Sequence, residues 1–271
     1  MIVEDKIVFE KNTFSKRTKS MMHIDMRRMF KSKLFYILIA CALIIPILMT
    51  VMMSMMDGSV STNPQTGEQT VMKGPENTWQ NIGTIPGAET MGGMNIFMMC
   101  NINMMFMVVS IFICLFISDD FRSGYAKNLF TVRAKKGDYV VSKTICGCVC
   151  GTLMLLAYFL GSILGGAIAS LSFDLHGLNF GNIAMCIVSK IFLMPVFVSI
   201  FTLISVAAKQ KAWLSICGSL GGGMLLFMMV SMVTPLNSTP INVILCAVGG
   251  AGFGFGLGAI SNIVLKKTSL V

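Results

Sequence analysis

The sequence predicts an all-α integral membrane protein with six transmembrane helices and both termini in the cytoplasm. Three observations support this prediction: the composition, the number of long apolar runs, and the one-sided placement of Lys and Arg. Of the 271 residues, 55% are hydrophobic and only 12% are charged, whereas a soluble domain is about 25% charged. Lipid offers the backbone no hydrogen-bond partner, so apolar runs of about 20 residues cross it as helices.

Six apolar runs are long enough to span a bilayer. They cover residues 34–56, 91–118, 144–171, 182–208, 213–233 and 241–265. Residues 1–33 then form a cytoplasmic N-terminal segment, and residues 34–271 form the transmembrane domain. We expect the first run to be an uncleaved anchor, because the segment before it is too long and too polar for a signal peptide.

The basic residues indicate which loops are cytoplasmic. Of the 21 Lys and Arg residues, only Lys73 and Lys190 lie outside the N-terminal segment, residues 119–143 and 209–212, and the C-terminal tail. Basic loops stay in the cytoplasm, and an even number of spans agrees with this assignment. We therefore expect a multi-pass protein of a plasma membrane, with membrane lipid and no nucleic acid among its partners. The resemblance described below implies a bacterial membrane.

The segment before the first run has the pattern of an interfacial helix. Met22, Met26, Met29 and Phe30 fall on one helical face, and Lys16, Lys19, His23, Arg27 and Lys31 fall mostly on the other. This pattern predicts a helix in the headgroup layer, with its basic side chains on anionic lipid. The alternative is a basic flank without defined structure.

Two other segments leave alternatives open. The predicted outer loop, residues 57–90, contains a hairpin-like "NPQTGEQ" and forms either a small folded cap or a flexible connector. All nine Cys residues lie in the apolar runs, and we interpret "CGCVC" at 146–150 as packing residues of a helix. No metal site and no catalytic residue is predicted.

The stretch "DDFRSGYAKNLFTVRAKKGDYVVSK", residues 119–143, interrupts the apolar sequence with charge. Asp119 and Asp120 come first, and acids at a helix start accept free N–H groups and suit the helix dipole. A stripe of apolar residues spaced by four follows, at Phe121, Tyr125 and Leu129. The pattern predicts a short amphipathic helix over residues 119–130.

Two further features suggest that this stretch is a docking surface. Gly124 lies in the middle of the predicted helix, where it costs about 1 kcal/mol relative to Ala, and close approach of another backbone would explain it. A basic rim follows at Lys127, Arg133, Lys135 and Lys136. The alternative is a solvated loop whose apolar stripe rests on the lipid interface.

The stretch resembles the first cytoplasmic loop of permease subunits in the ABC-2 type family of ATP-binding-cassette transporters. In that family an acid precedes a glycine, and a Lys-Asn pair, an apolar pair, a basic residue and a closing Ser-Lys follow. The matching residues are Asp119 or Asp120, Gly124, Lys127-Asn128, Leu129-Phe130, Arg133 or Lys135, and Ser142-Lys143. The chain departs from the family pattern at Tyr125, where Thr is common, and at "AKKGD", where a Ser-Arg pair is usual.

The resemblance implies that residues 119–131 form a coupling helix in contact with a separately encoded ATPase. The implied contact residues are Asp119, Asp120, Phe121, Arg122, Gly124, Tyr125, Lys127, Asn128, Leu129 and Arg133. The chain has no G-x-x-x-x-G-K-[ST] phosphate loop, so ATP and Mg would bind to the partner and no cofactor to this chain.

The same resemblance implies an exporter built with a second permease copy or a related permease. The cargo would be hydrophobic or amphipathic, such as a peptide antibiotic, a drug or a lipid-like molecule, and export would give resistance to antimicrobial peptides. The rival interpretation is a membrane scaffold or sensor without transport of its own, which signals through the basic loop.

Lys190, Asn101 and Asn103 are the candidate cargo-path residues. A Lys inside a span is costly and is a functional candidate. Alternatively, residues 181–190 form an interfacial helix, the span begins at Ile191, and Lys190 extends to the headgroups. Asn101 and Asn103, expected deep in the second span, would mainly hydrogen-bond to other helices.

Overall fold

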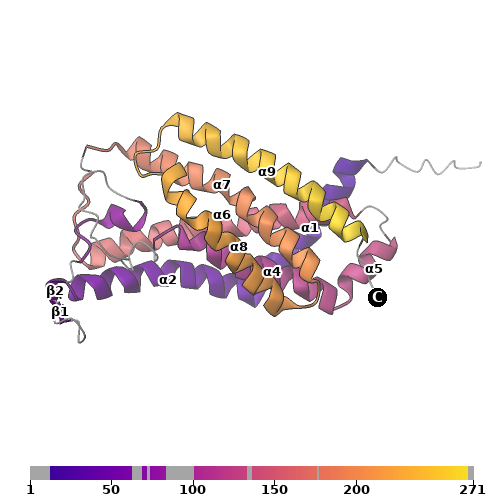
Figure 1. Cartoon of the computed structure of the whole chain (residues 1–271), viewed down its shortest axis with the longest axis horizontal. Coiled ribbons are helices and arrows are strands. Elements are labelled where there is room, and N and C mark those ends of the chain that lie inside the picture. The colour runs from indigo at the N-terminus through magenta and orange to yellow at the C-terminus, as the bar shows by residue number, and fades with distance from the viewer. Residues whose placement is uncertain are drawn as a thin grey trace, which may run out of the picture.

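The computed structural model describes residues 13–62, 69–71, 74–83, 101–132, 136–175 and 177–267. Within these residues, six helices are long and apolar enough to cross a membrane, which confirms the prediction of six spans. They are α2 (Lys33–Met55), α4 (Met104–Arg122), α6 (Gly137–Ile168), α7 (Phe180–Ala208), α8 (Ala212–Val233) and α9 (Pro240–Lys267). Figure 1 shows them as an elongated bundle.

The short elements lie at the two ends of the bundle (Figure 1). Helices α1 (Phe14–Lys31) and α5 (Tyr125–Val132) lie at one end, which we call the α5 end. Strands β1 (Val60–Thr62) and β2 (Gln69–Val71) form an antiparallel hairpin at the opposite end, which also carries the 3-10 helix η1 (Thr78–Asn81). Residues 63–68, which join the two strands, lie outside the described residues, as do residues 91–100 of the second predicted run.

Two spans are longer at the α5 end than the apolar pattern predicts. Helix α4 continues past residue 118 to Arg122, and α6 begins at Gly137 rather than at residue 144. The added turns contain Asp120, Asp138 and Lys143, whose side chains are buried. Hydropathy excludes such residues from a span, but a charge that is paired inside the bundle does not end a helix.

Residues 74–83 are folded onto the end of α6. The N–H of Thr78 donates to the carbonyl of Ser172 (3.0 Å), and the indole N–H of Trp79 donates to the carbonyl of Phe173 (3.2 Å). The side chain of Asn77 accepts from the N–H of Trp79 and donates to the carbonyl of Asp174. This part of the predicted outer loop is therefore a folded cap rather than a free connector.

Glycines allow the closest contacts between spans. Helix α2 packs on α6, and α9 packs on α7. A Cβ atom at Gly161 of α6 would clash with the carbonyl of Leu43 in α2, and one at Gly250 of α9 would clash with the carbonyl of Phe192 in α7. The neighbouring Gly249, in contrast, faces open space.

This contrast predicts opposite effects of two adjacent substitutions. Gly250→Ala should lower the apparent melting temperature by about 5 °C, because forcing a methyl into a packed contact costs roughly 1–3 kcal/mol. Gly249→Ala is the matched control and should leave the melting temperature unchanged or raise it, because Ala favours helix by about 1 kcal/mol over Gly. Circular dichroism in detergent measures both, and equal effects would contradict the packing of α9 on α7.

Candidate functional site

Helix α5 is joined to α4 by only two residues, Ser123 and Gly124. Gly124 has φ +75°, and a Cβ atom there would meet nothing within 4 Å. The left-handed conformation is costly for residues other than glycine. The predicted continuous helix over residues 119–130 is therefore wrong: the chain turns at Gly124, and the glycine serves this turn rather than a close approach.

The two acids before this turn lie in different environments. The prediction that Asp119 and Asp120 begin a helix is wrong. They belong to the last turn of α4. The apolar pattern of α4 continues through Ile117 to Phe121, both of which are buried, so the helix does not end before the acids. Asp119 is exposed, whereas Asp120 is fully buried.

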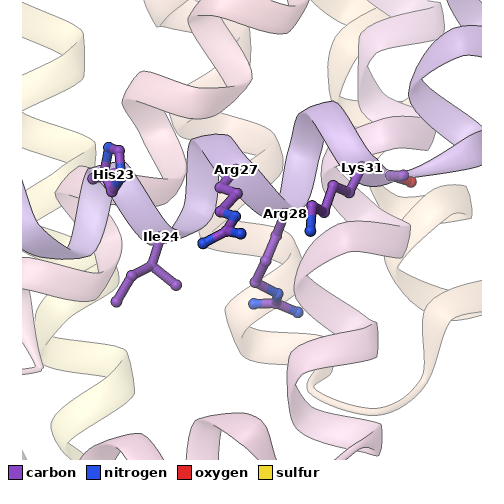
Figure 2. Close-up of a pocket in the computed structure, with 6 residues that line it drawn as sticks. His23, Ile24, Arg27, Arg28 and Lys31 are labelled. Atoms are coloured by element: carbon purple, nitrogen blue, oxygen red, sulfur yellow. The ribbon is translucent and has the colours of Figure 1, made fainter.

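Apart from Met29, the residues of α1 that are buried against the bundle are not those of the apolar face predicted to lie in the headgroup layer. Met21, Asp25 and Met29, spaced by four, are buried, whereas Phe30 is 41% exposed. On the open side, side chains of α1 line a groove of about 440 Å³ (Figure 2). The groove is lined by His23, Ile24, Arg27, Arg28, Lys31 and Ser32.

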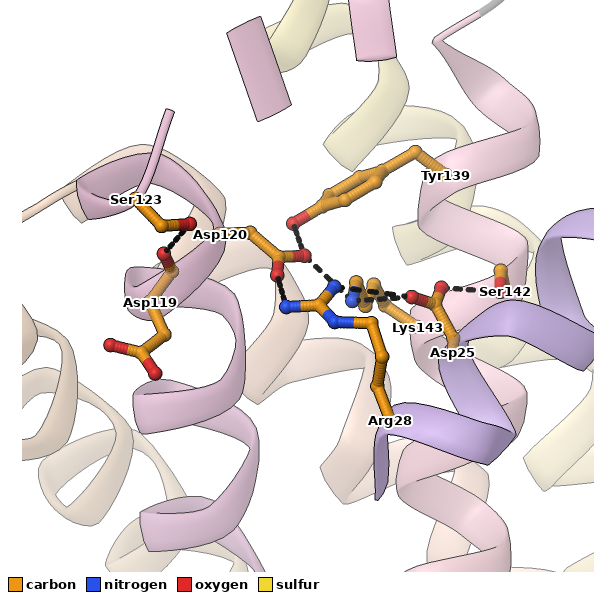
Figure 3. A network of polar contacts seen from close by, with 8 residues as sticks. All are labelled: Asp25, Arg28, Asp119, Asp120, Ser123, Tyr139, Ser142 and Lys143. Carbon is orange, nitrogen blue, oxygen red and sulfur yellow. Dashed lines mark hydrogen bonds and ion pairs between the residues drawn. The ribbon is translucent and has the colours of Figure 1, made fainter. Parts of the chain in front are cut away.

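Asp120 is the centre of a buried ion-pair network (Figure 3). Its two carboxylate oxygens lie 2.6 Å from Nη2 of Arg28 in α1 and 2.6 Å from Nζ of Lys143 in α6. The hydroxyl of Tyr139 in α6 donates to the same carboxylate (3.0 Å). Three helices far apart in the sequence therefore meet at this one side chain.

Asp25 of α1 completes the network from the other side. Its carboxylate accepts from Nζ of Lys143 (2.9 Å) and from the hydroxyl of Ser142 (2.6 Å), and it lies 3.6 Å from Nη1 of Arg28. Two carboxylates thus face two cations, and the charges balance. The network is defined here as Asp25, Arg28, Asp120, Tyr139, Ser142 and Lys143.

The network also holds α5. The guanidinium of Arg28 lies 4.3 Å from the ring centroid of Tyr125, the first residue of α5. Burial lowers the pKa of Arg28, but the charges of Asp120 and Asp25 and the hydrogen bond to Asp120 together outweigh it. The net pKa is raised, so Arg28 stays charged. Burial raises the pKa of Tyr125, which keeps its phenol neutral against the guanidinium.

Helix α5 has one anchored face and one free face. On the inner face Ala126 is buried, and the ring of Phe130 meets the ring of Tyr139 edge-on, with centroids 5.3 Å apart. On the outer face Lys127 and Asn128 are exposed. The short helix is thus fixed to the bundle and presents a polar surface.

The structure divides the implied contact residues into two groups. Four are exposed: Asp119, Arg122, Lys127 and Asn128. Phe121, Tyr125 and Leu129 face the bundle together with Asp120. Gly124 forms the turn, and Arg133 lies outside the described residues. Sequence reasoning missed Asp25, Arg28 and Tyr139; the one signal for Asp25 is its place between Met21 and Met29 at helical spacing.

The second cluster lies towards the opposite end, around Lys190. This residue is fully buried within the continuous helix α7, so the interpretation in which it extends to the headgroups is wrong. Its ammonium donates to Oδ1 of Asn103 (2.6 Å), to Oγ1 of Thr234 (2.9 Å) and to the carbonyl of Thr234 (3.4 Å). Three acceptors match the three N–H bonds of an ammonium group.

The asparagines of this cluster precede α4 rather than lie deep in it. Asn103 directly precedes Met104, the first residue of α4, and its amide donates to the hydroxyl of Ser231 in α8 (3.0 Å). The side chain of Asn101 accepts from the N–H of Asn103 (3.0 Å) and shapes this turn. The cluster therefore joins the start of α4 to α7 and to the end of α8.

Comparison with known families decides the affiliation of the chain. The sequence profile of the ABC-2 family transporter proteins matches residues 26–224. The chain belongs to the ABC-2 transporter family. No curated protein and no solved structure gives a significant match.

The ABC-2 match covers most of both clusters, but Ser231 and Thr234 of the second cluster lie beyond it. It begins within α1 and ends within α8, so it includes Lys190, Asn103 and every residue of the network except Asp25. As an ABC-2 family protein with six apolar helices, the chain is a multi-pass protein of the plasma membrane. Permeases of the ABC-2 family generally work with an ATPase partner.

Proposed function

We propose that this chain is the membrane-spanning permease subunit of an ABC-2 type exporter, and that α5 is the helix through which a separately encoded ATPase acts on it. The observation that carries the proposal is the two-faced environment of α5. Its inner face is fixed to the bundle through Arg28, Phe130 and Ala126, and its outer face is free and polar. ATP and Mg are then bound by the partner, and the α5 end faces the cytoplasm.

The network supports this proposal because it connects α5 to the spanning helices α4 and α6. A displacement of α5 moves Tyr125, which contacts Arg28, and Arg28 is paired with Asp120 of α4. Lys143 carries the same displacement to α6, which packs against α2. The two ion pairs of Asp120 are 2.6 Å long, and Asp120 and Lys143 are buried, so the helices move together rather than slide past one another.

A hydrophobic or amphipathic cargo fits the buried charges of the described spans. Asp120, Lys143 and Lys190 are buried, and each is paired or hydrogen-bonded within the chain. Asp138 is likewise paired with Arg17 of α1 (2.9 Å). None of these groups is available to recognise a charged cargo, which favours peptide antibiotics, drugs or lipid-like molecules.

Helices α8 and α9 offer the surface for a second permease copy or a related permease. They are the least buried spans, and they expose large apolar side chains along much of their length. Examples on α8 and α9 are Leu225, Met228, Met232, Val248 and Phe255. Lipid covers whatever part of this surface the second subunit leaves free.

The decisive experiment changes the outer face of α5 alone. Lys127→Glu combined with Asn128→Glu should reduce the stimulated ATP hydrolysis of the complex by about tenfold or more, equivalent to roughly 1.4 kcal/mol. Both positions are exposed, so the melting temperature should stay within about 2 °C of wild type. The measurements are co-purification of the ATPase with tagged permease and ATP hydrolysis in liposomes.

The matched control changes two other exposed residues at the same end, with Lys266→Glu and Lys267→Glu at the end of α9. This control should keep stimulation near the wild-type value. Normal stimulation in the α5 variant, or an equal loss in the control, would overturn the docking role. If the wild-type chain purifies without any ATPase, the scaffold or sensor is favoured instead.

A further inference from the structure

The groove on the open side of α1 has the composition of an anion site. Ile24, Arg27, Arg28 and Lys31 extend from the same side of the helix (Figure 2). Its lining includes three cations and no carboxylate. Within the described part of the chain, Arg27 and Lys31 form no ion pair, whereas Arg28 is paired with Asp120.

The groove lies at the depth expected for the lipid headgroups. Ser32, which lines the groove, directly precedes Lys33, the first residue of the spanning helix α2. Tyr36 in the first turn of α2 and Trp213 at the start of α8 are 58% and 78% exposed. Exposed Tyr and Trp near span ends mark the membrane–water interface.

Apolar surface lies next to the cations. Ile24 in the groove is 42% exposed, and α2 exposes a stripe formed by Ile37, Ile44 and Leu48. A soluble anion makes no use of such surface, whereas the acyl chains of a lipid cover it. Cations followed along the chain by an exposed apolar helix face match the two parts of an anionic lipid.

We infer that this groove is a binding site for the headgroup of one anionic phospholipid, with Arg27 and Lys31 contacting its phosphate. Arg28 lines the groove and is also paired with Asp120, so it connects the site to the network. A bound headgroup therefore holds α1 in place where α1 supports α5. The site is independent of the ATPase, so lipid binding is measurable on the permease alone.

The test is lipid binding to the full-length chain by native mass spectrometry in detergent, with phosphatidylglycerol and phosphatidylcholine of identical acyl chains as probes. Wild type should bind phosphatidylglycerol at least about tenfold more tightly, because each basic residue near an anionic lipid contributes about 1 kcal/mol. Arg27→Gln with Lys31→Gln should weaken binding of phosphatidylglycerol on the order of 30-fold. Lys266→Gln with Lys267→Gln, the matched control, should change it less than about twofold.

Several results would overturn the proposal that this groove binds an anionic phospholipid. Equal binding of the two lipids removes the preference for an anion, and equal losses in both double variants reduce it to general attraction by a basic end. Displacement of the lipid by the same concentration of inorganic phosphate assigns the groove to a free anion. Unchanged lipid binding with loss of the ATPase in Arg27→Gln/Lys31→Gln assigns it to the protein partner.

Discussion

Asp120→Asn is expected to lower the apparent melting temperature of the permease by on the order of 10 °C, because breaking a buried ion pair costs about 3–5 kcal/mol. The substitution keeps the shape of the side chain but leaves Arg28 and Lys143 with one carboxylate between them, that of Asp25. Asp119→Asn is the matched control. Asp119 is exposed, so its loss should shift the melting temperature by no more than about 2 °C.

A second substitution tests whether charge balance is the cause. Lys143→Met in the Asp120→Asn background leaves Asp25 and Arg28, which lie 3.6 Å apart, as a neutral pair. The double variant should be more stable than the sum of the single effects predicts, by at least about 1 kcal/mol of coupling free energy. Circular dichroism on the four proteins of this cycle gives the coupling, and additive effects would contradict a shared network. Stimulation of the ATPase should follow the same order as stability, because the network supports α5.

Asn103→Leu is expected to destabilise the opposite end of the bundle by about 3 kcal/mol, or roughly 8 °C in melting temperature. The Oδ1 atom of Asn103 is the nearest acceptor of the buried ammonium of Lys190, at 2.6 Å. Without it, a charged donor remains buried and lacks one acceptor. Asn103→Asp is the matched control: it keeps an acceptor for Lys190, and the hydroxyl of Ser231 can turn and donate to the new carboxylate. It should therefore lose far less stability.

A double variant again tests the cause of the lost stability. If the stranded charge of Lys190 is responsible, Lys190→Met should restore part of the stability lost in Asn103→Leu. A double variant that is less stable than Asn103→Leu would contradict this cause. Transport by the folded fraction of each variant then shows whether Lys190 also contacts cargo, and unchanged transport would remove it from the cargo path.

The spans were predictable because lipid imposes a simple rule on them. A run such as 213–233 has to be helical across a bilayer, and α8 follows it within one residue at its start. The rule fails at the charged ends of α4 and α6. Asp120 and Lys143 look like loop residues until their partners are known, and the partner Arg28 lies 92 positions before Asp120 in the sequence. Pairing over such distances leaves no local pattern.

The candidate site shows the same limit of sequence-based prediction at individual residues. The resemblance to ABC-2 permeases drew attention to Asp120, Ser142 and Lys143, and the structure joins them through the carboxylate of Asp25 and the ammonium of Lys143. Asp25 lies between Met21 and Met29 at helical spacing, but this pattern does not reveal which side chains pair with its charge. Gly124 is visible in the sequence, but its positive φ is not. The predicted helix therefore ran through the turn.

The two-residue connection between α4 and α5 limits how α5 can be oriented relative to α4. Ser123 and Gly124 form a turn and not a continuation of the helix, so one inserted residue between Arg122 and Tyr125 would change this turn and displace α5 relative to α4. Tyr125 would then lose its contact with Arg28. The length of this connection is thus a constraint of its own, separate from the identity of any residue on either helix.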